Sequence, residues 1–352
     1  MRTRITKFIL RSFALAFLAA GVAGCISPSQ ISRRIVTAPN LQNPSSEGWT
    51  DYWFSMARFS ESPMRPINIP VGPPDAVLSA VELPAADYQL KFTSSVTFRS
   101  KDHGDFVLKA FRETNAVVKP VAQRGTVVLL HGYAMQRETM MPWAFVLAQA
   151  GYRVVLVDLR GHGRSTGEYF TCGKYEVPDL VQMLDYLQAH RGYEGQVGVL
   201  GLSFGADLGL LWAARDARVR TVVAMAPYDK PEDALVRLAK VMKIPVSADT
   251  LRKGATMAAA QLQLDWPALS GDYAVRHLKQ PVLFIGGAND TISPVDEIRA
   301  MEALAPAGSD IVVVPKANHF VIGYWFDQIQ KPVTEWFAAH LTAVEAKPPK
   351  GD

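Results

Sequence analysis

The chain has 352 residues, of which 49% are hydrophobic and 20% charged, with 25 glycines and 23 prolines. This composition is that of a globular protein with one large domain or two small ones, and it excludes collagen-like, coiled-coil, disordered and polytopic membrane proteins. The formal net charge of +4 comes entirely from four basic residues near the N-terminus, Arg2, Arg4, Lys7 and Arg11. The rest of the chain carries no net charge, so it lacks the basic excess of a nucleic-acid-binding protein.

The N-terminus combines this basic start with a short apolar stretch. Residues 13–24 are apolar or small and too few to span a membrane permanently. Together the two features predict a secretory signal peptide over residues 1–24. The stretch ends in Val22-Ala23-Gly24-Cys25, which resembles the lipobox of bacterial lipoproteins.

That resemblance implies that the signal peptide is cut before Cys25 and that Cys25 carries acyl chains. Several chains give a stable membrane anchor, whereas one alone binds only marginally. Ile26, rather than Asp, follows the cysteine, which favours the outer membrane, facing the periplasm, over retention at the inner membrane. The alternative is an incidental cysteine in an ordinary cleaved signal. Cys172 is the only other cysteine, so a lipidated chain has no intramolecular disulfide.

Three segments follow the signal peptide. Residues 25–48 are rich in Ser, Pro, Asn and Gln and predict a lipidated cysteine with a tether. Residues 49–87 are Pro-rich and predict an irregular segment that wraps over the domain. Residues 88–345 contain alternating strand and helix patterns and predict the folded domain.

Within this domain, short apolar strands alternate with amphipathic helices, after a hairpin predicted over residues 88–111. The strands are predicted at 126–130, 154–158, 197–200, 221–226, 281–285 and 311–314, and the helices at 138–150, 175–190, 204–215, 294–304 and 321–341. This order predicts an α/β fold, with a mostly parallel sheet covered by helices on both faces. Residues 228–279 interrupt the order and predict a small helical cap over the carboxyl edge of the sheet.

One motif in the domain has the form G-x-S-x-G: Gly201-Leu202-Ser203-Phe204-Gly205. The pattern is short enough to occur by chance, but here it follows an apolar strand and opens a helix. A nucleophile elbow requires this context, because so sharp a turn leaves no room for β-carbons beside the serine. The turn also places Ser203 at the positive end of the helix dipole.

Four further segments follow predicted strands in the same way. They are Leu130-His131-Gly132-Tyr133, Asp158-Leu-Arg-Gly-His-Gly-Arg-Ser165, Gly286-Gly-Ala-Asn-Asp290 and Ala317-Asn-His319-Phe. With the serine motif, they make the sequence resemble the α/β-hydrolase superfamily over roughly residues 88–342, so we expect that fold.

The resemblance implies a role for each matched residue. Ser203 is the implied nucleophile, His319 the base that takes its proton, and Asp290 the acid that orients the imidazole. The backbone N–H groups of Tyr133 and Phe204 are the implied oxyanion hole. No metal and no cofactor is required by this chemistry.

Two assignments have alternatives. Asp229, which follows the strand at 221–226, is the rival acid, because some lipases of the superfamily take the acid from that strand end. The glycines at 161, 163 and 167 suggest a dinucleotide-binding turn, but residues 168–174 intervene before the next helix, against the motif's usual context. Apolar cap residues can be read in two ways, as an acyl pocket or as contacts that hold the cap to the core: Val241, Met242, Met257, Leu262 and Trp266.

We therefore expect a membrane-anchored serine hydrolase that acts on carboxylic esters through an acyl-enzyme. Lysophospholipids and esters of short or medium acyl chains are the candidate substrates. A thioesterase or an aminopeptidase-like hydrolase would use the same triad, because specificity depends on the cap rather than on the triad. A hypothesis from another class is a catalytically silent envelope scaffold. The sequence identifies no protein partner.

Overall fold

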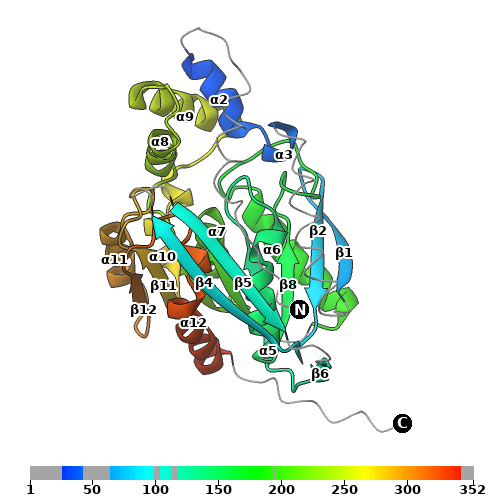
Figure 1. Ribbon diagram of the computed structural model, residues 1–352. Coiled ribbons are helices and arrows are strands. Elements are labelled where there is room, and N and C mark those ends of the chain that lie inside the picture. Colours follow the sequence, from blue (N-terminus) through cyan, green and yellow to red (C-terminus); the bar gives the residue numbers. More distant parts are fainter. Residues whose placement is uncertain (1–25, 43–63, 99–103, 113–116, 194–195, 342–352) are drawn as a thin grey trace.

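The computed structural model describes residues 26–42, 64–98, 104–112, 117–193 and 196–341 (Figure 1). Its centre is an eight-stranded sheet in the order β1-β2-β8-β7-β9-β10-β11-β12. The strands are β1 (Arg65–Val71), β2 (Ala76–Leu83), β7 (Gly125–Leu130), β8 (Tyr152–Val157), β9 (Val197–Leu202), β10 (Val219–Met225), β11 (Val282–Gly287) and β12 (Asp310–Val314). Strands β7 to β12 are parallel to one another, whereas β2 is antiparallel to both of its neighbours. The predicted α/β class with a mostly parallel sheet is confirmed.

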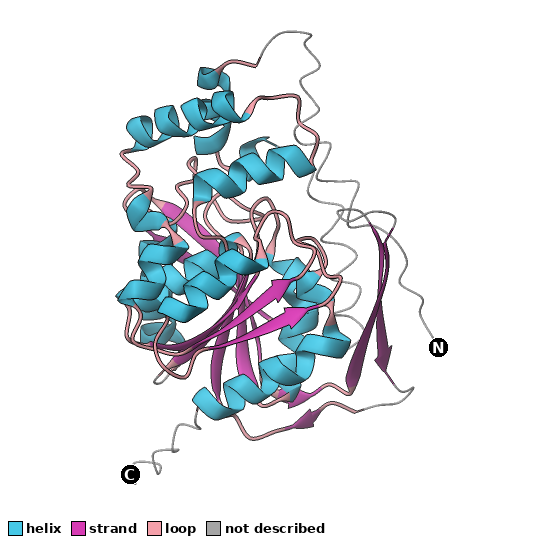
Figure 2. Ribbon diagram, turned by 90° about the vertical axis from the view of Figure 1, so that its left-hand side faces the viewer, coloured by secondary structure: helices cyan, strands magenta, loops and turns pink. Residues whose placement is uncertain are grey.

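Helices cover both faces of this sheet (Figure 2). Helices α6 (Glu176–Arg191), α7 (Phe204–Arg215), α10 (Gly271–His277) and α11 (Val295–Leu304) bury their apolar side chains on one face. Helices α5 (Met141–Gln149) and α12 (Phe326–His340) cover the other, together with the hairpin of β4 (Leu90–Phe98) and β5 (Gly104–Arg112). Because both faces are covered, every residue of β7, β9 and β11 is buried, which explains their continuous apolar sequences.

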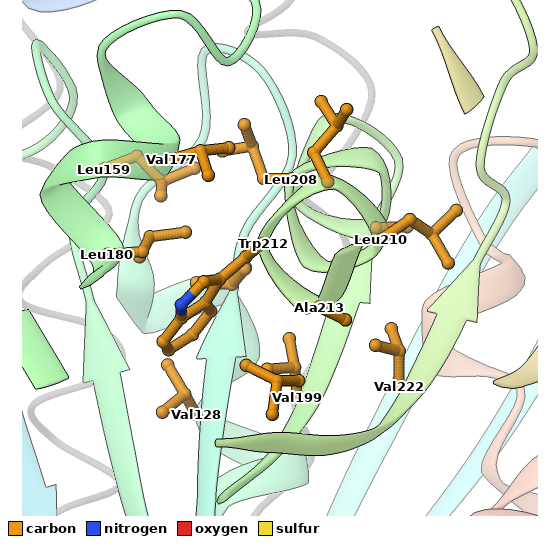
Figure 3. Packing of buried hydrophobic residues seen from close by; sticks show 14 of the residues in the cluster. Val128, Leu159, Val177, Leu180, Val199, Leu208, Leu210, Trp212, Ala213 and Val222 are labelled. Carbon is orange, nitrogen blue, oxygen red and sulfur yellow. The ribbon is translucent and has the colours of Figure 1, made fainter. Parts of the chain in front are cut away.

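Trp212 of α7 fills the centre of the first of these layers (Figure 3). Its side chain is fully buried and reaches from the helix toward Val128 and Val199 on the sheet. Leu180 of α6 packs into the same cluster. This packing fixes α7, and therefore the turn that precedes it, on the sheet.

Smaller elements complete the domain. The predicted helices at 138–150 and 321–341 each begin with a 3₁₀ turn, η1 (Arg137–Met140) and η3 (Ile322–Tyr324). Two short strands, β3 (Ala86–Asp87) and β6 (Lys119–Pro120), pair with each other. Within the described residues, no helix is long and apolar enough to cross a membrane.

The prediction of an irregular segment over residues 49–87 is wrong for its second half. β1 and β2 lie there and extend the central sheet at one edge, so the domain begins well before residue 88. Pro66 and Pro70 are compatible with β1 because it is the edge strand, where a missing N–H leaves no gap in the ladder. Residues 43–63 lie outside the described part of the chain.

The prediction of a tether over residues 25–48 is also wrong where the structure describes it. Helix α2 (Pro28–Val36) begins with a capping box, in which Ser27 accepts a hydrogen bond from the Gln30 N–H. The short helix α3 (Pro39–Gln42) follows. Ile31 of α2 is buried against the cap, so this segment is docked on the domain.

The cap differs in extent from the predicted residues 228–279. It consists of α8 (Pro231–Val241) and α9 (Ala248–Leu262), which α2 joins in a layer at the top of Figure 1. Ile31, Ala239 and Leu251 form its own small apolar cluster. The 3₁₀ turn η2 (Pro267–Leu269) leads into α10, which packs on α7 and α11 and therefore belongs to the helix layer of the sheet.

Candidate active site

The five motif segments meet at one edge of the sheet. The register pairs Leu130 with Gly201, Leu202 with Met225, and Gly287 with Val314, so the parallel strands end together. Ligand sites of parallel α/β sheets lie at this carboxyl edge. Ser203, Asp290 and His319 are in the loops that follow β9, β11 and β12.

The serine lies in a strained turn between β9 and α7. Its φ of 53° and ψ of −120° lie in a region that L-residues rarely adopt. The flanking glycines allow the turn: a β-carbon on Gly201 would lie 2.2 Å from the carbonyl oxygen of Gly205, and one on Gly205 would lie 2.3 Å from the carbonyl oxygen of Leu130. The tight packing leaves the Ser203 side chain partly exposed above the helix N-terminus.

A chain of hydrogen bonds joins three side chains at this edge. The Oγ of Ser203 lies 2.8 Å from Nε2 of His319, and Nδ1 of His319 lies 2.9 Å from Oδ2 of Asp290. Because an ionised carboxylate can only accept, Nδ1 carries the imidazole proton and Nε2 is left to accept from the serine hydroxyl. The carboxyl group of Asp290 is fully buried, whereas 11% of the His319 side chain is exposed. The structure thus brings together the three residues that the sequence singles out.

Asp290 is fixed from its other side. Its Oδ1 accepts hydrogen bonds of 2.8 Å from the backbone N–H groups of Ile292 and Ser293. The Ser293 hydroxyl donates to the carbonyl oxygen of Ala226 at the end of β10. Ser293 lies outside the motifs of the sequence, although an aspartate in a loop commonly accepts hydrogen bonds from backbone N–H groups just after it.

The loops that carry Asp290 and His319 are bonded to each other. The Asn289 N–H donates to the Ala317 carbonyl at 2.9 Å. A β-carbon on Gly287 would lie 2.4 Å from the same carbonyl oxygen, so only glycine allows this close approach. These backbone contacts fix the acid relative to the histidine.

The rival acid, Asp229, has a different environment. Its Oδ1 accepts a hydrogen bond of 3.3 Å from the Asp272 N–H, and its carbonyl accepts one of 2.7 Å from the Gly271 N–H. Both partners lie in the first turn of α10. The structure therefore pairs Asp290 with His319 and places Asp229 at the start of a helix.

Tyr133 and Phe204, the residues of the implied oxyanion hole, lie on either side of the serine. Phe204 is the first residue of α7, where backbone N–H groups point away from the helix. Tyr133 follows Gly132, whose β-carbon position is 3.7 Å from the Ser203 β-carbon. Both residues thus lie beside the nucleophile turn, where the implied oxyanion hole would have to be.

His131, next to the site, has a structural environment. It is fully buried, its Nδ1 bonds the Gly132 carbonyl at 2.8 Å, and its Nε2 accepts from the Leu159 N–H at 3.0 Å. Burial lowers the pKa of His131 to about 4, so the ring is neutral at pH 7. It connects the end of β7 to the loop after β8.

The loop after β8 is braced by buried charges. Asp158 accepts backbone hydrogen bonds from Arg137 and Arg164. Arg160, in the same loop, forms a bidentate pair with Asp179 of α6, with N–O distances of 2.6 and 2.7 Å. The glycines that suggested a nucleotide site pack against the protein itself, because β-carbons on Gly161 and Gly163 would meet Ala38 and Asp158.

The apolar residues of the cap have different environments. Leu262 and Trp266 are partly buried and pack against the core, which supports the role of holding the cap in place. Met257 is 44% exposed. Among the described residues, no group of three or more His, Cys, Asp or Glu side chains could hold a metal ion.

Comparisons with known proteins agree with this fold. The family model described as "Serine aminopeptidase, S33" matches residues 121–274. The esterase Pf2001 of Pyrococcus furiosus superposes with a TM-score of 0.60 at 18% identity, covering 81% of this chain and 94% of that one. The chain has the α/β-hydrolase fold.

Two curated relatives of this chain have an assigned activity in their names. The monoacylglycerol lipase of Mycolicibacterium smegmatis is 26% identical over 263 residues, which cover 62% of this chain and 89% of that protein. Esterase YjfP of Escherichia coli is 28% identical over 211 residues, which cover 54% and 80% respectively. An uncharacterised protein of Bacillus subtilis, YqkD, is 24% identical over 230 residues, covering 58% and 73%. The chain is thus similar to two named hydrolases over more than half of its length.

Proposed function

We propose that the protein is a serine hydrolase that cleaves carboxylic esters through an acyl-enzyme, with Ser203 as nucleophile, His319 as general base and Asp290 as the residue that orients it. The observation that supports this most strongly is the hydrogen-bond chain from Ser203 Oγ to His319 Nε2 and from His319 Nδ1 to Asp290. A serine hydroxyl is a weak nucleophile unless an adjacent base accepts its proton.

In the first half of the reaction, Ser203 Oγ bonds to the ester carbonyl carbon while its proton passes to His319 Nε2. Negative charge then develops on the carbonyl oxygen, which faces the N–H groups of Tyr133 and Phe204. When the C–O bond to the leaving group breaks, His319 returns the proton to the departing alkoxide. The products of this step are the alcohol and an ester of Ser203.

In the second half, water takes the place of the alcohol. His319 accepts a proton from the water as its oxygen bonds to the acyl carbon, and the intermediate collapses to release the carboxylic acid. The proton returns to Ser203 Oγ. Asp290 stays ionised throughout and stabilises the transient imidazolium.

The relatives named above support an ester as the substrate, because they include a lipase and an esterase. Lysophospholipids and short or medium acyl esters are the substrates that we propose.

A second candidate is an amidase-type activity, which the description of the matching family model favours. A panel of p-nitrophenyl esters, acyl thioesters and aminoacyl p-nitroanilides distinguishes these classes, with Ser203→Ala as the matched control. The proposal predicts turnover of the esters that is lost in Ser203→Ala. Turnover confined to the aminoacyl amides would contradict it and favour the aminopeptidase. A folded enzyme that turns over nothing in the panel would favour a scaffold.

We also propose that Cys25, which lies outside the described residues, is acylated and anchors the enzyme in the bacterial envelope, at the periplasmic face of the outer membrane. Helix α2 begins three residues after this cysteine and is docked on the cap. An anchor there would hold the cap next to the membrane surface. Cys25→Ser should shift the full-length protein to the soluble fraction or block its processing. Unchanged fractionation with membranes would contradict lipid anchoring, and density-gradient separation of the two membranes tests the location.

A further inference from the structure

Four aromatic rings gather beside the nucleophile turn. Phe170 lies at their centre, with ring centroids 4.8 Å from both Tyr133 and Phe204 and 6.0 Å from His162. The contacts with Tyr133 and Phe204 are edge-to-face, with interplanar angles of 62° and 61°. Tyr133 and Phe204 are the two residues whose backbone N–H groups form the proposed oxyanion hole. One side chain therefore touches the side chains of both.

The backbone of Phe170 is held by the N-terminal segment. Residues 36–38, which we call the strap, connect α2 to α3. The Phe170 N–H donates to the Val36 carbonyl at 2.9 Å, and the Ala38 N–H donates to the Glu168 carbonyl at 2.9 Å. Thr37 and Tyr169 form an antiparallel bridge between these two bonds. The strap thus acts as a short strand that pairs with residues 168–170.

Both flanks of this pairing are buried. Ala38 has no exposed surface, and its β-carbon would lie 2.5 Å from a β-carbon on Gly161. On the other side of Phe170, the Thr171 N–H donates to the buried carboxylate of Glu176 at 2.8 Å. The position of the Phe170 ring is therefore set by the strap before it and by α6 after it.

We propose that Phe170 is a positioning residue for the oxyanion hole, held in place by the N-terminal strap. The inference rests on the proposed serine-hydrolase function and adds to it a residue and a segment that the triad does not include. Oxyanion donors act only when they lie about 2.7–3.1 Å from the developing charge, and a misplacement of about 1 Å can lower the rate on the order of 100-fold. The Phe170 ring keeps the two donor residues at a fixed separation because it packs against both.

Phe170→Ala tests the role of the ring, with Tyr169→Ala as the matched control on the neighbouring, partly exposed residue. We expect Phe170→Ala to lower kcat for a p-nitrophenyl ester by about 10- to 100-fold with KM changed less than about 3-fold. Phe170→Leu, which retains most of the apolar bulk, should recover most of that loss. Tyr169→Ala should stay within about 2-fold of the wild type, because it removes a side chain outside the ring cluster.

A trifluoromethyl ketone gives a readout that a merely structural role would not change. It adds to the active serine, and its oxygen occupies the oxyanion hole, so its inhibition constant should rise by the same factor as kcat/KM falls. Circular dichroism shows whether Phe170→Ala folds. If the folded variant has an unchanged kcat and an unchanged inhibitor affinity, the proposal is overturned.

A variant of the strap tests the second half of the proposal without altering the ring. Ala38→Leu adds bulk where Gly161 leaves no room, so it should displace the strap, increase hydrogen exchange at the Phe170 amide and lower kcat as Phe170→Ala does. Leu41→Ala, on a side chain that is 60% exposed, is the control. Faster exchange at Phe170 with unchanged kcat would overturn the role of the strap. A wild-type protein that neither hydrolyses esters nor reacts with a fluorophosphonate would overturn the proposed function itself.

Discussion

Gly205 and Leu130 are in backbone contact beneath the nucleophile turn: a β-carbon on Gly205 would lie 2.3 Å from the Leu130 carbonyl oxygen. The turn after β9 can therefore approach the end of β7 only because residue 205 has no side chain. This contact brings Ser203 next to Gly132, which precedes the Tyr133 N–H.

Replacing this glycine should disrupt the turn. In Gly205→Ala the added methyl group must displace backbone atoms, so we expect the free energy of unfolding to fall by about 3 kcal/mol or more. Esterase activity should fall as well, because the same turn carries Ser203. Urea denaturation and ester turnover measure the two effects. Gly125→Ala, where a β-carbon meets nothing within 4 Å, is the matched control. Equal stability and activity of the two variants would refute the close contact.

The pairing of His319 with Asp290 predicts which aspartate matters for catalysis. Asp290→Asn should lower kcat on the order of 10⁴-fold, because the amide can stabilise the wrong tautomer of His319 and cannot neutralise its positive charge. Asp229→Asn, which alters the rival acid at the start of α10, should remain within a few-fold of the wild type. Ester turnover by the two purified variants tests this, and the reverse ranking would assign the acid to Asp229.

Two buried histidines predict a loss of stability in acid. Burial lowers the pKa of His131 to about 4 and that of His162 to about 3, against about 6.5 in an unfolded chain. Below pH 6.5 the unfolded state binds more protons than the folded state, so stability falls as the pH decreases from 6.5 toward 4. At pH 4.5 each histidine should account for a loss of about 2–3 kcal/mol, since one pKa unit corresponds to about 1.4 kcal/mol.

Denaturation of the wild type and of His131→Asn at pH 7 and pH 4.5 measures this effect. The asparagine variant should be less stable at pH 7, because the Leu159 N–H loses its usual acceptor, but it should lose less stability between the two pH values. An identical pH dependence of the two proteins would show that His131 does not titrate as its burial predicts.

Breaking the buried ion pair between Arg160 and Asp179 should lower the free energy of unfolding far more than breaking an exposed ion pair. Asp179→Ala leaves a guanidinium that is 2% exposed without its bidentate partner and should lower the free energy of unfolding by about 3–5 kcal/mol. Glu335→Ala removes the exposed partner of Lys331 and should change it by less than about 0.5 kcal/mol. Thermal denaturation compares the two, and equal effects would contradict this account of the loop.

The sequence predicted the parts of the fold that depend on local patterns. The strands of the parallel sheet are continuous apolar runs, and the turns after them carry glycine, serine, aspartate and histidine at fixed offsets. Gly201 and Gly205 are visible as a motif because they flank Ser203 at fixed offsets, although only the steric requirement at Gly201 is local and that at Gly205 comes from Leu130. The segments at Asp290 and His319 were found because each follows an apolar strand.

What the sequence did not predict depends on contacts between distant residues. Pro66 and Pro70 argued against a strand, and only the position of β1 at the sheet edge makes them compatible with one. Helix α2 has polar residues typical of a tether, and its fixed position depends on Ile31 meeting Gly254, more than 200 positions later. Phe170 has no motif around it, and its contact with Tyr133 and Phe204 arises only when three loops meet.

The central claim, that Ser203 is an activated nucleophile, is tested most directly by a fluorophosphonate probe on purified residues 26–352, with intact mass and peptide mapping as the readout. We predict one covalent adduct per chain, on Ser203, which is lost in His319→Ala. A folded protein that remains unlabelled, or one labelled at another residue, would contradict the account.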